Sequence, residues 1–276
     1  MVRVVDSLTP ILDMSAHLGL AGSDPVPLRS TNNVVVWLRP TPVVVKATAS
    51  PRNRLGWELM VATALHDAEA PVGGPSALVE PVVYHHDGWH MSFWTYHPQS
   101  EADPEPTAVA RALAQLHEKL DALNVDPAWS LSTWDEAPKD VLRRLEDESF
   151  ACLLGRADRE LLRTALGAFD QVSELSDDHG GLHGSPHSFN TLTVPRSPIF
   201  IDFETARRGP REWDLCHTDA AVTEAYQGSL SEVALEKARL IVSAMTSALC
   251  WDGIDRGPDM RFHAEQHLAQ VRSALA

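Results

Sequence analysis

Runs rich in β-branched residues alternate with turn signals over the first third of the chain. Residues 34–38 and 43–46 are two such runs separated by Arg-Pro-Thr-Pro, which predicts a hairpin. Residues 78–85 and 89–96 flank an Asp-Gly pair, a strong signal for a second hairpin. Between the hairpins, apolar residues at helical spacing predict a helix over residues 53–68. We therefore expect a small antiparallel sheet that carries one helix.

A polar, proline-rich stretch interrupts this pattern at residues 97–106. Beyond it, apolar residues at steps of three and four predict helices near residues 113–123, 139–154, 158–175, 214–227 and 230–250. One hairpin signal stands among them, at residues 191–203. A β-rich part followed by a helical part predicts an α+β fold with two lobes, residues 1–97 and 98–276, and a cleft where they join.

Composition argues against several classes of protein. The 276 residues carry 23 basic and 38 acidic side chains, a formal charge of −15, whereas binding to nucleic acid needs a basic surface. No apolar run approaches the roughly 18 residues of a membrane helix, and the first residues lack the apolar core of a signal peptide. The three cysteines form no CxxC pair, so we expect a cytoplasmic protein with reduced cysteines.

The first candidate for chemistry is a lysine and a glutamate twelve residues apart. Lys46 ends an apolar run, and Glu58 lies on the face of the predicted helix that carries its apolar residues. A carboxylate on that face needs a partner, because an unpaired buried charge is costly. A strand lysine paired with a helix glutamate is the ion pair that grips nucleotide phosphates in kinases. The pair is a candidate nucleotide site, and a solvent-facing lysine is the alternative.

The second candidate is the segment from His183 to Asn190. The spacing of His179, His183 and His187 would suit zinc on a helix, but the glycines and the proline between them exclude a helix. Ser185 near His187 would suggest a nucleophile and its base, but the G-x-S-x-G elbow is absent. The interval from His183 to Asn190 instead equals that of the kinase loop H-R-D-L-x-x-x-N, whose asparagine binds magnesium.

The third candidate is the acidic segment Ile-Asp-Phe-Glu, in which Asp202 lies twelve residues after Asn190. A kinase places its second magnesium-binding residue at this point of the chain. Mg²⁺ prefers a few hard oxygen ligands together with phosphate oxygens, so an amide and a carboxylate suit it. We predict a magnesium site here, and the alternative is a surface loop followed by an ordinary hairpin.

These motifs resemble the aminoglycoside phosphotransferase and choline kinase-like branch of the protein-kinase-like fold. The family's loop, H-G-D-x-H-x-x-N, matches residues 183–190 except at Ser185, and its acidic segment, I-D-[FW]-[DE], matches residues 201–204. A following G-P-x-x-x-D-L matches residues 209–215. The resemblance covers about residues 28–222 and implies a nucleotide-dependent, magnesium-dependent small-molecule kinase.

The resemblance also implies a role for each motif. The residues that would bind ATP or GTP are Lys46, Glu58, Asn32, Trp94 and Tyr96. Those that would hold Mg²⁺ are Asn190, Asp202 and Glu204. Asn32 belongs to the first set because residues 29–33 stand in the place of the loop that covers the phosphates. Asp214 would brace the catalytic loop.

Ser185 stands where the family carries its catalytic aspartate. That carboxylate accepts or positions the proton of the attacking hydroxyl, which an un-ionised serine cannot do in the same way. The predicted catalytic residues are Ser185, His187 and His183, and His187 or Glu204 are candidates for the missing base. Two functions follow: a phosphotransferase with altered base chemistry, or a nucleotide-binding pseudokinase with a regulatory or binding role.

The acceptor is predicted to be a small polar molecule bound over the helical lobe, lined by parts of residues 124–180 and 217–265. The net charge of −15 fits a cationic acceptor such as an aminoglycoside or amino sugar. Candidate contacts include the tryptophans Trp129, Trp134, Trp213 and Trp251, and the alternative for each is a place in the core.

Overall fold

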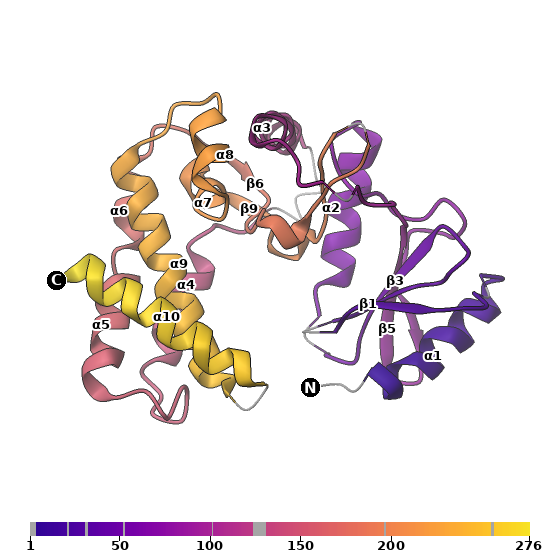
Figure 1. Cartoon of the computed structure of the whole chain (residues 1–276), viewed down its shortest axis with the longest axis horizontal. Coiled ribbons are helices and arrows are strands. Elements are labelled where there is room, and N and C mark those ends of the chain that lie inside the picture. Colours follow the sequence, from indigo (N-terminus) through magenta and orange to yellow (C-terminus); the bar gives the residue numbers. More distant parts are fainter. Residues whose placement is uncertain are drawn as a thin grey trace. The chain divides into compact units, whose positions relative to one another are not determined.

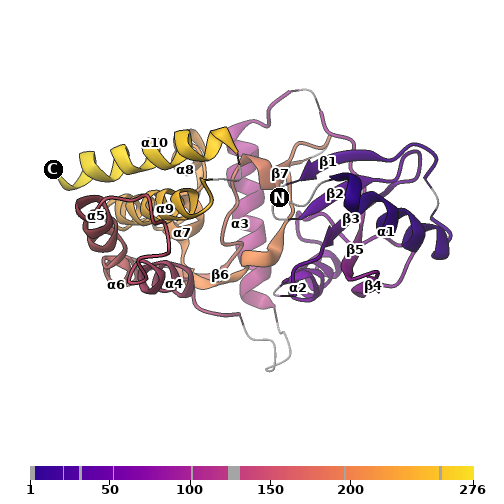
Figure 2. The same ribbon diagram turned by 90° about the horizontal axis from the view of Figure 1, so that it is seen from below.

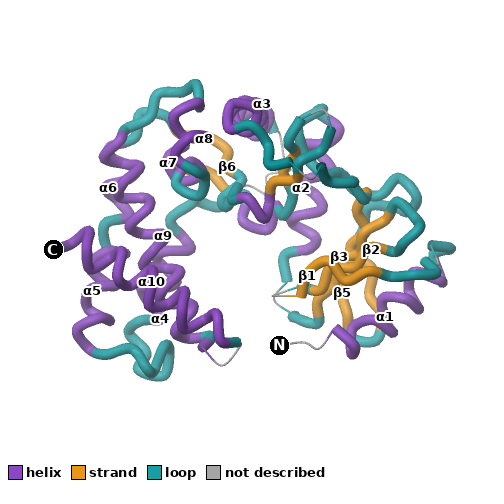
Figure 3. Tube along the Cα trace, in the orientation of Figure 1, coloured by secondary structure: helices purple, strands orange, loops and turns teal. Residues whose placement is uncertain are grey.

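The computed structural model describes residues 4–276, except residues 21, 31–32, 52, 101, 124–130, 196 and 255–256. The chain divides into two compact units: Met1–Ser130 with His187–Ala206, and Leu131–Pro186 with Arg207–Ala276. Strands are concentrated in the first unit and helices in the second (Figure 3). The two units are defined by which residues pack together and not by function. The predicted division into two lobes at residue 97 therefore stays a prediction.

The first unit is built on a five-stranded antiparallel sheet with the strand order β1-β2-β3-β5-β4. Its strands are β1 (Val26–Ser30), β2 (Val34–Trp37), β3 (Val43–Thr48), β4 (Tyr84–His86) and β5 (Trp89–Thr95). Both predicted hairpins are present, and Asp87 and Gly88 adopt the positive φ that the second turn needs. The prediction of a strand from residue 78 was wrong, because Pro81 lacks the N–H that a sheet ladder requires.

Alternation along the central strands gives this sheet two different faces. The side chains buried on one face are Val34 and Val36 of β2 with Val43, Val45 and Ala47 of β3. They pack with Ile11 and Met14 of α1 (Val4–His17), a helix that the sequence analysis did not predict. The helix α2 (Leu55–Asp67), predicted for residues 53–68, lies on the opposite side of the sheet from α1 (Figure 1).

A distant part of the sequence completes the first unit. The predicted hairpin over residues 191–203 is present as β7 (Thr191–Leu192) and β8 (Ile199–Phe200), with 3₁₀ turns before and after it. The backbone N–H of Gly73 donates to the carbonyl of Phe200 at 2.9 Å, and Phe200 is fully buried. The same unit contains α3 (Pro106–Ala122), whose apolar periodicity the sequence showed.

The second unit is mainly helical, and α9 (Glu232–Asp252) lies at its centre. The other helices are α4 (Glu136–Arg144), α5 (Arg156–Leu166), α6 (Phe169–Leu175), α7 (Arg211–Leu215), α8 (Ala220–Ala225) and α10 (Pro258–Leu275). The last of these runs alongside α9 (Figure 2). Two of the predicted helices, over residues 158–175 and 214–227, are each divided in two. No helix among the described residues has both the length and the apolar character needed to cross a membrane.

Two tryptophans lie at the centre of the second unit's core. Trp134 and Trp213 are 3% and 2% exposed, and their ring centroids are 4.7 Å apart. Of the two interpretations offered for them, a place in the core is confirmed and contact with an acceptor is wrong, because both side chains are enclosed by the core. Trp129 lies outside the described residues.

The strands β6 (His179–Leu182) and β9 (Arg207–Pro210) pair antiparallel in the second unit, and no sequence signal predicted them. In this pair Gly180 lies opposite Gly209. A Cβ atom on Gly209 would overlap the indole of Trp134. The close approach of strand and ring therefore requires glycine at this position.

We expect Gly209→Ala to lower the free energy of unfolding by about 1–3 kcal/mol, because the added methyl group must displace the buried Trp134 ring. Chemical denaturation followed by circular dichroism measures the loss. Gly155→Ala is the matched control, since a Cβ there meets only Asp158 Oδ2 at 3.8 Å. Equal stability of the two variants would contradict the close packing described here.

Candidate active site

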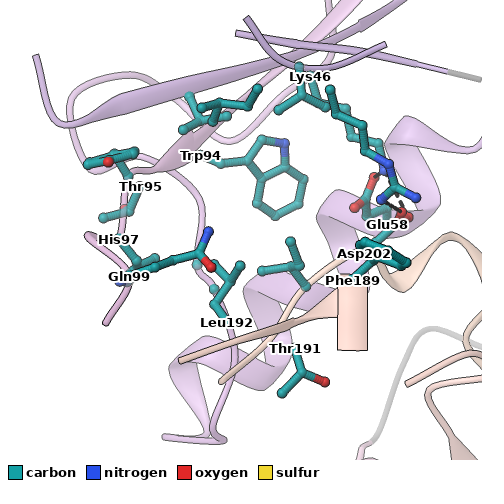
Figure 4. A pocket seen from close by; sticks show the side chains of 18 of the residues that line it. Lys46, Glu58, Trp94, Thr95, His97, Gln99, Phe189, Thr191, Leu192 and Asp202 are labelled. Carbon is teal, nitrogen blue, oxygen red and sulfur yellow. Dashed lines mark hydrogen bonds and ion pairs between the residues drawn. The ribbon is translucent and has the colours of Figure 1, made fainter. Parts of the chain in front are cut away.

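Lys46 binds three carboxylates in the first unit. Its Nζ atom lies 2.8 Å from Glu58 Oε2, 2.9 Å from Asp202 Oδ1 and 2.8 Å from Glu204 Oε1. The lysine is 7% exposed and Glu58 is 2% exposed, so the central pair is buried. The structure thus brings together residues from β3, from α2 and from the segment after β8 (Figure 4).

The period of two in β3 explains why this lysine points to the site. Val43, Val45 and Ala47 face the core shared with α1, so Val44 and Lys46 face the other side of the sheet. Glu58 lies in the first turn of α2 among buried apolar residues, and its carboxylate accepts a hydrogen bond from Lys46 Nζ at 2.8 Å. A carboxylate so deeply buried depends on such a partner, because leaving it unpaired is costly.

Burial and neighbouring charges shift the pKa values of this pair. Burial alone lowers the pKa of Lys46, but Glu58, Asp202 and Glu204 together raise it well above its ordinary value. Burial raises the pKa of Glu58 to about 7, and the attraction of Lys46 only partly opposes this. The ammonium therefore stays charged at neutral pH, while Glu58 takes up a proton far more readily than an exposed glutamate.

Asp202 and Asn190 present oxygen atoms to a second cation. Arg29 Nη1 donates to Asn190 Oδ1 at 3.5 Å and lies 4.0 Å from Asp202 Oδ2. Asn190 Nδ2 lies 3.4 Å from His187 Nε2, so the amide is oriented with its nitrogen toward the imidazole and its oxygen toward the arginine. Asp202 has a φ of 70°, a left-handed conformation that is costly for a residue with a Cβ and concentrates at functional sites.

The carboxylate and amide oxygens of this site are suitable ligands for a divalent cation. Glu58, Asp202 and Glu204 each offer an oxygen within a group spanning 4.8 Å, but Lys46 Nζ already lies between the oxygens it binds. One oxygen of Asn190 and one of Asp202 both face the positively charged Arg29 guanidinium. They are the hard amide and carboxylate ligands that Mg²⁺ prefers. Glu204 Oε1 also accepts from Asn33 Nδ2 at 2.7 Å, which fixes its carboxylate beside them.

A cavity of about 620 Å³ extends from this charged group. Val35 and Val44 of the sheet and Leu192 and Ile201 of the β7–β8 segment supply apolar walls. Lys46, Glu58 and Asp202 lie together at one side, His97 and Gln99 at the other, and the indole of Trp94 lies between them (Figure 4). The cavity thus has one charged side and a largely apolar body with a polar far side.

Both predicted aromatic residues line this cavity. Trp94 Nε1 donates to Ser92 Oγ at 2.9 Å, and Tyr96 stacks on Trp37 with ring centroids 3.9 Å apart. Asn32, the other predicted nucleotide contact, lies outside the described residues.

Sequence reasoning missed several lining residues, including Gly73, His97, Gln99 and Phe189. A signal existed for Gly73, which belongs to a Gly-Gly pair, and a Cβ there would come within 2.8 Å of Ile201 Cγ2.

The loop that holds Ser185 belongs to the second unit. The backbone N–H groups of His183 and Gly184 donate to the two carboxylate oxygens of Asp214, both at 2.7 Å. The backbone N–H of Ser185 donates to His183 Nδ1 at 3.3 Å, and His183 is fully buried. Asp214 therefore braces this loop, in the way that the resemblance implied. His187 follows two residues after the serine and belongs to the first unit.

The sequence model of the phosphotransferase enzyme family matches residues 26–246. The chain therefore belongs to the phosphotransferase enzyme family, and the resemblance stated from its motifs is confirmed. A comparison with curated protein sequences finds no match.

Solved structures show the fold. The chain is similar to an amicoumacin kinase in complex with AMP-PNP, Ca²⁺ and Ami, at 13% identity over 99% of this chain and 96% of that chain, with a TM-score of 0.73. A choline kinase from Streptococcus pneumoniae has 15% identity over 98% and 99% of the two chains and a TM-score of 0.72. The GDP complex of an aminoglycoside 2′-phosphotransferase-IIIa has 15% identity over 99% and 100%, with a TM-score of 0.70. The predicted α+β, kinase-like fold is confirmed.

We expect Lys46→Met to destabilise the protein by about 3 kcal/mol at pH 8, because three carboxylates lose their shared cation. The pKa of Glu58 is already raised in the folded state, and it rises further without the lysine. A raised carboxyl pKa favours folding at low pH and loses that contribution as the pH rises through it. The loss should therefore shrink when urea denaturation is repeated at pH 5.5.

Lys119→Met, which removes a lysine of α3 outside the cavity, is the matched control. A loss in Lys46→Met that is the same at both pH values would show that the three carboxylates do not depend on this cation.

Proposed function

We propose that this family member transfers the terminal phosphoryl group of ATP or GTP, with Mg²⁺, to a hydroxyl group of a small polar acceptor such as an amino sugar or aminoglycoside. The observation that carries the proposal is the buried Lys46, held by Glu58, Asp202 and Glu204 at the charged side of a 620 Å³ cavity. The phosphotransferase family supplies the reaction class.

The shape and chemistry of the cavity support a nucleotide. A planar base suits the apolar walls, and the polar side chains of His97 and Gln99 lie at the side away from the charges. Lys46 is fixed by Glu58 and would orient phosphate oxygens, as the corresponding ion pair does in kinases. Similar folds carry GDP, AMP-PNP and ADP in the solved complexes, which supports nucleotide use here.

Asn190, Asp202 and Glu204 would hold the Mg²⁺ ion. When bound, Mg²⁺ would supply positive charge that offsets the charge of the phosphate groups. Two neighbours prepare these ligands: His187 orients the Asn190 amide, and Asn33 fixes Glu204. Nucleotide binding therefore begins from side chains that are already hydrogen-bonded in place, which reduces the ordering that binding must impose.

The identity of the base is the open chemical step, because Ser185 replaces the family's aspartate. Burial lowers the pKa of His187, Arg29 lowers it further, and Asp202 opposes both. The imidazole is therefore neutral at neutral pH and able to accept a proton. We propose Nε2 of His187 as the atom that would receive the proton of the acceptor hydroxyl, in exchange for the hydrogen bond that it accepts from Asn190 Nδ2, while Ser185 and the buried His183 shape the loop before it.

The acceptor is proposed to be cationic. The chain carries a net charge of −15, and a negative surface attracts positively charged ligands. Two solved structures of similar fold point the same way, a choline kinase and a complex with kanamycin, since both compounds carry positive charge.

We expect ADP or GDP release when the protein is incubated with Mg²⁺, ATP or GTP, and a panel of aminoglycosides, amino sugars and amino alcohols. A coupled assay measures turnover, and thermal shift measures nucleotide binding. Asp202→Asn should lower turnover by at least about 100-fold, because it removes a charged ligand at the phosphates.

The two measurements separate the possible outcomes. Nucleotide-dependent stabilisation without turnover on any acceptor would favour the inactive, nucleotide-binding pseudokinase. Absence of both stabilisation and turnover would remove the nucleotide proposal altogether.

We expect Ser185→Asp to raise turnover by at most about 10²–10⁴-fold, the full contribution of a positioned base, and by less in proportion to what His187 already supplies. The variant should leave nucleotide binding unchanged, because the Asp214 hydrogen bonds that hold the loop come from the backbone of His183 and Gly184. Initial rates with the best acceptor measure the gain. Ser185→Ala is the control, and a loss of activity there would mean that the serine hydroxyl itself takes part in the reaction.

A further inference from the structure

Arg29 lies at an irregularity of β1 that turns its side chain toward the cavity. The pairing with β2 shifts between Pro27 and Arg29, so two steps along β1 match one step along β2. Neighbouring residues of a regular strand point to opposite faces, yet Leu28 and Arg29 both line the cavity. A β-bulge has this effect, since it redirects side chains and is common beside functional sites.

The bulge brings Arg29 to the ligands proposed for Mg²⁺. One atom, Nη1, lies 3.5 Å from Asn190 Oδ1 and 4.0 Å from Asp202 Oδ2. Each oxygen comes from a different proposed ligand, and both are of the kind that a divalent ion uses. A positive group of the protein's own therefore stands beside both oxygens.

The contacts of Arg29 differ in kind from those of Lys46. The lysine is buried and makes three contacts of 2.8–2.9 Å, whereas the arginine side chain is 40% exposed and its contacts are longer. Exposed ion pairs of this geometry hold weakly. Lys46 is therefore a fixed part of the site, and Arg29 is a group that can leave it at little cost.

We propose that Arg29 is a tethered cation that occupies the Asn190–Asp202 pair before nucleotide binds and moves to the phosphates when Mg²⁺ and nucleotide arrive. In the first state it reduces the repulsion within an acidic group that Lys46 alone does not neutralise. In the second state its planar guanidinium can bind phosphate oxygens through two parallel hydrogen bonds. The inference rests on the proposed function, since it requires a metal–nucleotide complex in the cavity.

If Arg29 has this role, removing it should change metal affinity and nucleotide affinity in opposite directions. A residue that competes with the metal and then binds the phosphates should weaken metal binding in the empty site and strengthen nucleotide binding in the loaded one. An arginine with a merely structural role would affect both in the same direction, through the stability of the site. The two binding constants therefore separate the explanations.

We expect Arg29→Gln to bind Mn²⁺ about tenfold more tightly than the wild type when no nucleotide is present. Electron paramagnetic resonance of free Mn²⁺, which prefers the same oxygen ligands as Mg²⁺, measures this constant. The same variant should bind AMP-PNP about tenfold more weakly at saturating Mg²⁺, measured by calorimetry. Arg29→Lys keeps the charge and should leave Mn²⁺ affinity near the wild-type value, with nucleotide affinity between those of the wild type and Arg29→Gln.

Arg111→Gln is the matched control, because it removes one positive charge from the exposed face of α3 in the same unit. Constants for Arg29→Gln that equal those of this control, or that both weaken, would overturn the inference while leaving the proposed function intact. A wild-type protein that binds neither Mn²⁺ nor AMP-PNP would instead overturn the proposed function, and the inference with it.

Discussion

The first unit depends on one ammonium group that binds three carboxylates. Negative charges a few ångströms apart repel one another by several kcal/mol at the effective dielectric of a protein site, so Glu58, Asp202 and Glu204 can be charged together only around a cation. Lys46 supplies it from the middle of the sheet. The interaction joins β3 and α2 to a segment about 150 residues further along the chain, and residues 187–206 thereby belong to the first unit.

The same interaction gives the cavity a charged side that differs from its apolar body. One side is charged and rigid, because Lys46 is buried and its partners come from α2 and from the segment that follows β8. The body is lined by aliphatic side chains of the sheet and of the β7–β8 segment, which favour a flat apolar group but give no direction to charge. A ligand with a planar ring at one end and anionic groups at the other suits this arrangement, and a nucleotide is such a ligand.

Ser185 lies in a loop whose support does not depend on the side chain at this position. Asp214 holds the loop through backbone N–H groups, which are independent of the side chain at residue 185. Phosphoryl transfer proceeds through a loose transition state, so positioning and charge neutralisation supply most of the catalysis. On the proposed function, a chain that keeps the buried lysine with its carboxylates, and separately keeps the braced loop, would retain most of what the reaction needs even with a weaker base.

Local signals in the amino-acid order were enough for several features. The two hairpins of the sheet, the helix α2 and the hairpin at residues 191–203 follow from turn residues and periodicity, which act over a few neighbours. The motifs also identified the family. The helix α1 was missed because it contains Pro10, which normally interrupts a helix. The pairing of β6 with β9 joins segments almost thirty residues apart, and neither has the β-branched alternation that marks a strand.

Other features arise only when distant segments pack together. That Lys46 meets Glu204 as well as Glu58, and that Arg29 reaches Asn190 through a bulge in β1, depends on the positions of backbones far apart in the chain. The sequence does not show which carboxylates will pair with a buried ammonium group. A carboxylate in an exposed loop and one beside Lys46 are the same residue types in the sequence, and they differ only after folding has removed the water between the two charges.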